Sequence, residues 1–110
     1  MSTLQRLQSW YTLQCNEEWE HRYGISIESC DNPGWWVKVE LEGTALEGKP
    51  FTRIVANVDS QGFQLGESWL HCHLDGSIWN GAGDESRLEQ ILELFLRWAE
   101  ENGESSATHS

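Results

Sequence analysis

Two segments of alternating apolar and polar residues, separated by one short turn, constrain the fold of this chain most. Apolar residues recur at every second position in residues 23–30 and again in residues 35–42. Between them, Asp31-Asn32-Pro33-Gly34 is typical of a turn. Proline fixes φ near about −65°, and glycine accepts the positive φ that a type II turn requires. The sequence therefore predicts a β-hairpin.

Helical patterns stand at both ends of the chain. Ser2 and Gln5 have the spacing of a capping box, and apolar residues recur at helical spacing after them, so we expect a helix over about residues 3–15. Residues 88–99 carry an unbroken apolar stripe, and Gly103 is a natural stop. A second, amphipathic helix is therefore expected near the C-terminal end.

The segments between the helices predict strands rather than further helices. Beyond the hairpin, we expect strands over residues 51–58, 69–74 and 77–81, turns at 59–62 and Asp75-Gly76, and a polar connection at 16–20. The order is α-β-β-β-β-β-α, and short connections favour neighbours in sequence as neighbours in space. We therefore expect an α+β fold, in which an antiparallel five-stranded meander sheet carries both helices on one face.

Length and composition indicate one intracellular domain. The 110 residues suit a single domain, expected over residues 1–103, with a disordered acidic and polar tail at 104–110. No apolar run approaches the roughly 20 residues of a membrane helix, and no signal peptide is recognised, so we expect a cytoplasmic protein without a membrane partner. Cys15, Cys30 and Cys72 form no C-x-x-C pair and are expected to be small buried hydrophobes.

The charge balance narrows the class of partner. Eighteen acidic residues face seven Lys and Arg, which gives a formal net charge of −11. The acidic excess gathers in residues 84–104 and 28–47. Such a surface repels nucleic-acid phosphates and attracts basic proteins, so we expect no nucleic-acid partner.

Strand alternation predicts a second, uncovered sheet face, which we call the open face. If the helices cover the face bearing Val37, Val39, Leu70 and Leu74, the open face presents aromatic, charged and histidine side chains. Flat rings beside polar groups are typical of the centre of a protein–protein interface. The residues predicted to bind a partner are Trp36, Lys38, Glu40, Trp69, His71 and His73, together with Trp79 on the last strand.

The sequence predicts no enzyme and no cofactor, because no nucleophile, phosphate-binding or metalloprotease motif is present. His71 and His73 point the same way on a strand, and Glu40, Glu20 or His21 could add a third zinc ligand. That set is incomplete, so no metal site is predicted. A small-ligand or metal-binding module that uses the two histidines stays open as the alternative function.

Several blocks of the sequence resemble the bacterial immunity protein 53 family of polymorphic toxin systems. They are Trp10-Tyr11, Trp19-Glu20-His21-x-Tyr23-Gly24-Ile25, Asp31-Asn32-Pro33-Gly34-Trp35, and Gly81-Ala82-Gly83 with the helix from Leu88 to Trp98. The match runs in order from about residue 4 to residue 100. Within it, a structural motif is expected from Trp19, Tyr23, Asp31, Asn32, Pro33, Gly34 and Trp35.

The resemblance implies a small cytosolic protein that binds a cognate toxin and neutralises it. Many such toxins are nucleases, whose substrate cleft is basic, and an acidic inhibitor can occupy that cleft. The main hypothesis is therefore that an acidic, aromatic-rich surface covers a basic toxin. The identity of the toxin, the surface that binds it and the oligomeric state are left open by the sequence.

Overall fold

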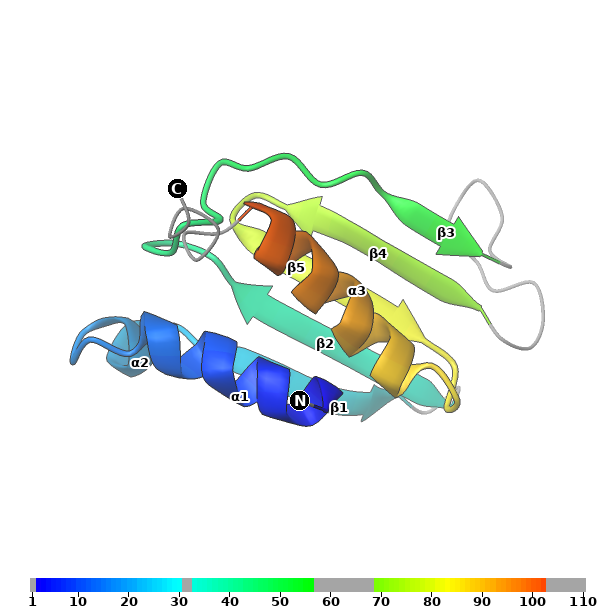
Figure 1. Cartoon of the computed structure of the whole chain (residues 1–110). Helices are drawn as coiled ribbons and strands as arrows, with labels where there is room; N and C mark the ends of the chain where they lie inside the picture. Colours follow the sequence, from blue (N-terminus) through cyan, green and yellow to red (C-terminus); the bar gives the residue numbers. More distant parts are fainter. Residues whose placement is uncertain (1, 31–32, 57–68, 103–110) are drawn as a thin grey trace.

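A computed structural model describes residues 2–30, 33–56 and 69–102 of the chain (Figure 1). The fold is α+β, as predicted. Along the chain, an N-terminal helix comes before the five strands of one antiparallel sheet and a C-terminal helix follows them. The elements are α1 (Thr3–Gln14), α2 (Trp19–Arg22), β1 (Ile25–Cys30), β2 (Gly34–Glu40), β3 (Ile54–Ala56), β4 (Leu70–Asp75), β5 (Ile78–Gly83) and α3 (Leu88–Asn102). The turn expected at 59–62 and the tail expected at 104–110 lie outside the described residues.

The strand order corrects the predicted meander. The sheet runs β1-β2-β5-β4-β3, and every neighbouring pair is antiparallel. A meander would place β3 beside β2, whereas the last strand, β5, occupies that position. The sheet thus consists of the predicted hairpin β1–β2 and a three-stranded unit β3–β4–β5 that joins it through β5.

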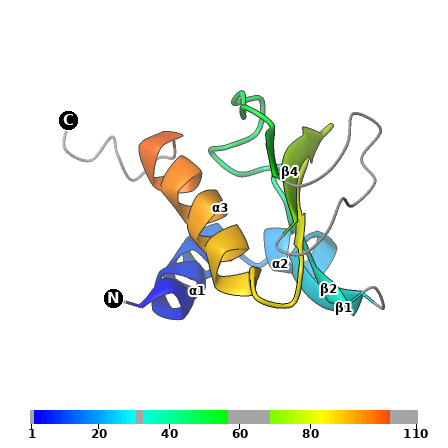
Figure 2. The ribbon, with the colours of Figure 1, turned by 90° about the vertical axis from the view of Figure 1, so that its right-hand side faces the viewer.

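The two long helices lie on one side of the sheet, as expected (Figure 2). In α1, the predicted capping box forms: Gln5 N donates to Ser2 Oγ at 3.1 Å, and Ser2 N donates to Gln5 Oε1 at 2.9 Å. Arg6 then joins α1 to α3, with its guanidinium 2.7 Å from Glu93 and 2.8 Å from Glu100. The part of the chain that the structure describes holds no helix able to span a membrane.

The core lies between α3 and the sheet and is rich in aromatic rings. Phe95 packs edge-on against Trp79 at 5.2 Å and against Trp10 at 5.1 Å between ring centroids. Phe51 contacts Trp79 and Trp98 in the same way, and Trp98 Nε1 donates to the Pro50 carbonyl at 2.8 Å. This bond holds the segment after β2 against the core.

The first hairpin forms where the sequence predicts it, but Gly34 has a different role. Asp31 and Asn32 lie outside the described residues, and Pro33 precedes the strand. Gly34 is the first residue of β2, pairs with Cys30 and does not have positive φ. A Cβ at this position would lie 2.4 Å from the Gly83 carbonyl oxygen. Glycine is therefore required by close approach of the backbone rather than by the turn.

A short helix occupies part of the connection expected at 16–20. Asn16 braces its start, because the Asn16 side-chain oxygen accepts from Glu18 N at 3.0 Å and from Trp19 N at 2.9 Å. Trp19 is buried and packs edge-on against Trp10 and Tyr11. The short helix α2 thereby fixes the end of α1 against the start of the sheet.

Candidate functional site

The strand register brings the open-face residues into rows across the sheet. One row runs from Trp36 on β2 through Ala82 on β5 to His71 on β4, and the next runs from Lys38 through Asn80 to His73. A third row joins Glu40, Ile78 and Asp75. In Figure 2 the long helices α1 and α3 lie on one side of the sheet. Val37 and Val39, which alternate with the β2 members of these rows, are fully buried in the core, so the rows lie on the other face. Five of the seven predicted partner-binding residues therefore share one surface.

Trp36 is the large aromatic residue exposed on this surface. Its side chain is 41 % exposed, although the indole Nε1 donates to Asn80 Oδ1 at 3.2 Å. Asn80 is itself buried and donates to the Ile78 carbonyl at 3.3 Å. The Lys38 ammonium lies 4.4 Å from the centroid of the Trp36 ring. The indole is thus fixed in one orientation while one part stays accessible.

His71 and His73 form a stacked pair on the neighbouring strand, with ring centroids 4.7 Å apart. Arg53, just before β3, donates from Nε to His71 Nε2 at 3.2 Å, so this nitrogen carries no proton. Burial, with the nearby His73 and Arg53, lowers the pKa of His71. His71 is therefore favoured in the neutral state.

The geometry does not complete a metal site around this pair. Within the described ranges, no group of three His, Cys, Asp or Glu side chains converges on one point. The guanidinium at His71 Nε2 also occupies the lone pair that a metal would use. The proposed third ligands Glu20 and His21 lie at α2, away from β4.

Two tryptophans predicted for the open face are corrected by the structure. Trp79 is fully buried in the core, because it pairs with Leu74 and therefore points toward the helices. Trp69 precedes β4 and is only 7 % exposed. Its ring fills the space beside Gly34, where an added Cβ would approach Trp69 Cζ2 to 3.2 Å. Neither indole is available to a partner.

The acidic excess does not coincide with the open face. Three acidic residues, Glu28, Glu40 and Asp75, stand there against Lys38 and Arg53. The denser acidic groups lie on α3 and around α2 and the turn after β2. They are Glu89, Glu93, Glu100 and Glu101 in the first group, and Glu17, Glu18, Glu20, Glu42 and Glu47 in the second. The predicted acidic, aromatic-rich surface is therefore divided into an aromatic face and separate acidic regions.

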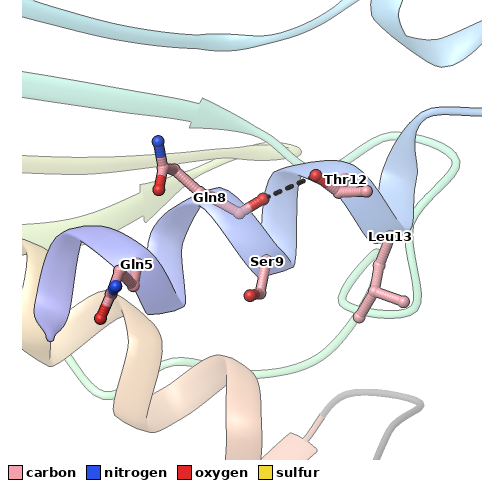
Figure 3. A pocket seen from close by; sticks show the side chains of 5 residues that line it. All are labelled: Gln5, Gln8, Ser9, Thr12 and Leu13. Atoms are coloured by element: carbon pink, nitrogen blue, oxygen red, sulfur yellow. Dashed lines mark hydrogen bonds between the residues drawn. The ribbon is translucent and has the colours of Figure 1, made fainter. Parts of the chain in front are cut away.

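A hollow along α1 is not a formed site. It measures about 540 Å³, and its described lining comes from α1 alone: Gln5, Gln8, Ser9, Thr12 and Leu13 (Figure 3). Thr12 Oγ1 donates to the Gln8 carbonyl at 2.9 Å, a bond within the helix. Side chains along one helix do not converge on a ligand from several directions.

Comparison with known families gives the class of the protein. A family described as immunity protein 53 matches residues 4–100, which is nearly the whole described fold. The chain belongs to the immunity protein 53 family. No curated protein and no solved structure gives a significant match. The family description assigns an immunity role, which implies a cognate toxin as partner.

The immunity protein 53 blocks that carry the sequence resemblance mostly build the fold. Trp19 lies in the core region near Trp10, and Trp35 is half-buried with its Nε1 donating to the Glu85 carbonyl at 3.1 Å. Hydrogen bonding to Glu42 and burial raise the pKa of Tyr23. Among the cysteines, only Cys72 is buried, whereas Cys15 and Cys30 are partly exposed.

Sequence reasoning missed Asn80 and Arg53 in this immunity protein 53 member. Asn80 supports Trp36, and Arg53 supports His71, but each acts across strands that are distant in sequence. The burial of Trp79 could have been predicted from the sequence. Across a two-residue hairpin turn, odd-numbered residues pair with even-numbered ones, so Trp79 lies on the same face as Cys72 and Leu74. No comparable local signal exists for Arg53.

Proposed function

We propose that this protein binds and neutralises its cognate bacterial toxin through the open face, with Trp36 as the central anchor. The observation that carries the proposal is the state of Trp36: exposed, yet oriented by Asn80 and Lys38. An aromatic ring that is ordered before binding loses little conformational entropy in a complex. Lys38, Glu40, His71 and His73 share the open face with it and would supply polar contacts.

The acidic regions act in this proposal as long-range attraction rather than as the contact itself. A net charge of −11 accelerates encounter with a basic protein, and salt screens that effect. A nuclease toxin has the required positive cleft, because it must hold phosphates. The expected complex therefore combines charge steering with an almost neutral aromatic contact.

The test uses calorimetry with the toxin encoded beside this gene. We expect Trp36→Ala to weaken binding by at least roughly 2 kcal/mol, as a central aromatic anchor does. Leu13→Ala serves as the control, because Leu13 is 69 % exposed on α1, which lies on the other side of the sheet. Equal affinity of the Trp36→Ala variant and the parent protein would remove the open face from the proposal. Absence of any complex at low salt would reject the toxin-binding function itself.

Association and dissociation rates of the same complex, measured by stopped-flow fluorescence at increasing salt, separate the two contributions. We expect added NaCl to lower the association rate of the parent and of Trp36→Ala by the same factor, because the acidic regions are intact in both. We expect Trp36→Ala to raise mainly the dissociation rate. A salt-independent association rate would contradict the role given to the acidic regions.

A further inference from the structure

The strand β1 forms an open edge of the sheet. It pairs with β2 on one side only, and Figure 1 shows it at the margin opposite β3. Its register with β2 continues without a break from Ile25 to Cys30, so the strand contains no bulge. Natural edge strands are usually protected by a lysine, a proline, a bulge or a very short length. β1 has none of these features, whereas β3, at the other edge, is only three residues long.

Every second residue of β1 directs its backbone N–H and C=O away from β2. The Glu40 N–H donates to the Gly24 carbonyl at 3.1 Å, so these two residues form a hydrogen-bonded pair of the antiparallel ladder. Such pairs alternate with pairs that are not hydrogen-bonded, and the even-numbered residues of β1 therefore bond to β2. The residues whose backbone groups point outward are Ile25, Ile27 and Ser29. Among the described residues, no backbone or side-chain group binds them on that side.

The side chain of Ile27 leaves apolar surface at this edge. Ile27 is paired with Val37, which is fully buried on the covered face, and directly opposed residues share a face. Ile27 thus points to the side of the helices, yet 41 % of it stays exposed. Ile25, by contrast, packs partly against the core. The edge therefore combines unpaired backbone groups with a half-open apolar side chain, which is the combination that a further strand would cover.

The charge at this edge is low for so acidic a protein. The chain has 18 acidic residues, but β1 contains only Glu28 and α1 contains none. Both elements lie at the same edge of the molecule in Figures 1 and 2. A site for a basic partner would be expected to carry carboxylates, whereas a partner with the same negative excess can approach only where carboxylates are few. A second copy of this chain is such a partner.

We propose that β1 pairs with β1 of a second copy of this chain, in antiparallel orientation about a two-fold axis at Ile27. The Ile27 residues of the two copies then face each other and exchange both backbone hydrogen bonds, and Ile25 does the same with Ser29 of the second copy. The two exposed Ile27 side chains cover each other, as in an isologous interface. The two five-stranded sheets thereby become one.

The sequence of β1 selects this register. About an axis at Ile27, the Glu28 carboxylate stands opposite Ser26 of the second copy, whose hydroxyl can donate to it. An axis at Glu28 would oppose two carboxylates, which is destabilising. An axis at Ser26 would leave only residues 25–27 paired within the two strands. The register at Ile27 pairs residues 25–29 and opposes no like charges within β1.

Pairing through β1 leaves the open face accessible. Residues that oppose each other across the axis share a sheet face, so the open faces of both copies point to the same side of the joined sheet. The long helices of both copies lie together on the other side. Self-association through β1 therefore does not depend on the proposed function and does not compete with it.

The test is sedimentation velocity of the full chain without the toxin. We expect the mass to rise from 12.6 kDa towards twice that value over roughly 1–500 µM, since an interface of one strand pair is small and weak. Ile27→Lys should raise the dissociation constant of the dimer at least about tenfold, because two lysines would meet at the axis. Val55→Lys is the matched control. It makes the same kind of exchange at an exposed position of the other edge strand, β3, and should leave the dimer unchanged.

An exchange of charges tests the register itself. Ile27→Lys and Ile27→Glu should each be monomeric, because each places like charges opposite each other at the axis. Their equimolar mixture should dimerise again, because a lysine then opposes a glutamate. The near-ultraviolet circular dichroism of each variant is expected to match that of the parent, since Ile27 is 41 % exposed and lies at the sheet margin.

Each other outcome rejects the pairing of β1 with itself. A parent that sediments as a monomer at every concentration overturns the proposal, and if Ile27→Lys then weakens toxin binding, the edge belongs to the toxin. A dimer that Ile27→Lys leaves intact, or that Val55→Lys weakens equally, is formed by another surface and overturns it as well. A mixture of the two Ile27 variants that stays monomeric rejects the axis at Ile27.

Salt separates this association from binding of the toxin. Added NaCl should strengthen the dimer, because it screens the repulsion between two chains of net charge −11. The same salt should slow association with a basic toxin. A dimer that NaCl dissociates is held by ion pairs and contradicts the pairing of β1. A protein that dimerises but binds no toxin loses only the proposed function, whereas a monomer that binds the toxin loses only the dimer.

Discussion

Gly81 lets α3 approach the sheet closely, so adding one methyl group at this position should lower the free energy of unfolding. Gly81 lies on the helix-covered face of β5, between Val37 on β2 and Cys72 on β4. A Cβ at this position would lie 2.5 Å from Ile91 Cγ2 and 2.7 Å from the Trp79 ring. Both neighbours are fully buried, so neither can move into solvent. The substitution Gly81→Ala therefore forces a shift of α3 or of the indole.

The expected magnitude follows from two opposing terms. Overpacking of a well-packed core by one methyl group costs about 1–3 kcal/mol. Replacing glycine by alanine in extended backbone returns roughly 0.5–1 kcal/mol, because the unfolded chain loses freedom. The net loss in the free energy of unfolding should be about 1–2 kcal/mol. At about 4 °C for each kcal/mol in a domain of this size, the Tm should fall by roughly 4–8 °C.

The assay is thermal unfolding followed by tryptophan fluorescence, with Gly24→Ala as the matched control. A Cβ on Gly24 meets no atom within 4 Å, so the same chemical change should leave the Tm equal or slightly higher. In an Ile91→Ala background, Gly81→Ala should cost about 1 kcal/mol less, because the closest clash is removed. If Gly81→Ala and Gly24→Ala have the same Tm, the explanation of Gly81 by the close approach of α3 is wrong.

Three further perturbations test other parts of the structure. The pKa of His71 is lowered in the folded state, so the unfolded state binds more protons between the folded pKa and about 6.5. The free energy of unfolding should therefore fall as the pH drops through this window. A denaturation series in which His71→Gln keeps the same pH slope would contradict this. Burial raises the pKa of Cys72 to about 12, so a thiol reagent at pH 8 should modify Cys15 and Cys30 first, and one common rate for all would disagree. Arg6→Met should lower stability by roughly 0.5–1 kcal/mol in dilute buffer and by less in 1 M NaCl, because its partners on α3 are partly exposed; an undiminished loss in salt would argue for packing instead.

The parts of the fold that depend on local pattern could be predicted from the sequence. Alternation in β2 placed Val37 and Val39 on the covered face, and both are fully buried. The Ser2–Gln5 capping box fixed the start of α1, because its two bonds join residues only three apart. Such features need no knowledge of distant neighbours. The same holds for the apolar stripe of α3, which packs as expected.

The parts that depend on distant partners could not be predicted in the same way. Nothing within β2 specifies β5 as its neighbour, and the Gly81-Ala82-Gly83 end of β5 has poor strand propensity. Instead, Gly81 leaves space for Ile91 of α3, and Gly83 leaves space for Arg87 and the Trp69 carbonyl. The candidate site shows the same division. Strand alternation predicted the face on which Trp36 and His71 lie. The burial of Trp69 instead depends on Gly34 of β2, which has no side chain where the Trp69 ring packs.

The strand order also has a consequence for how the chain assembles. The elements α1 to β2 follow one another in the chain and form one unit, and β3 to α3 form another. Among the described residues, the two units meet chiefly where β2 pairs with β5 and α1 packs on α3. Each unit can begin to fold from nearby residues, whereas their junction must close a long stretch of chain, so we expect the junction to form last. Cleavage between them, in the exposed turn around Gly48, should therefore yield two fragments that recombine when mixed.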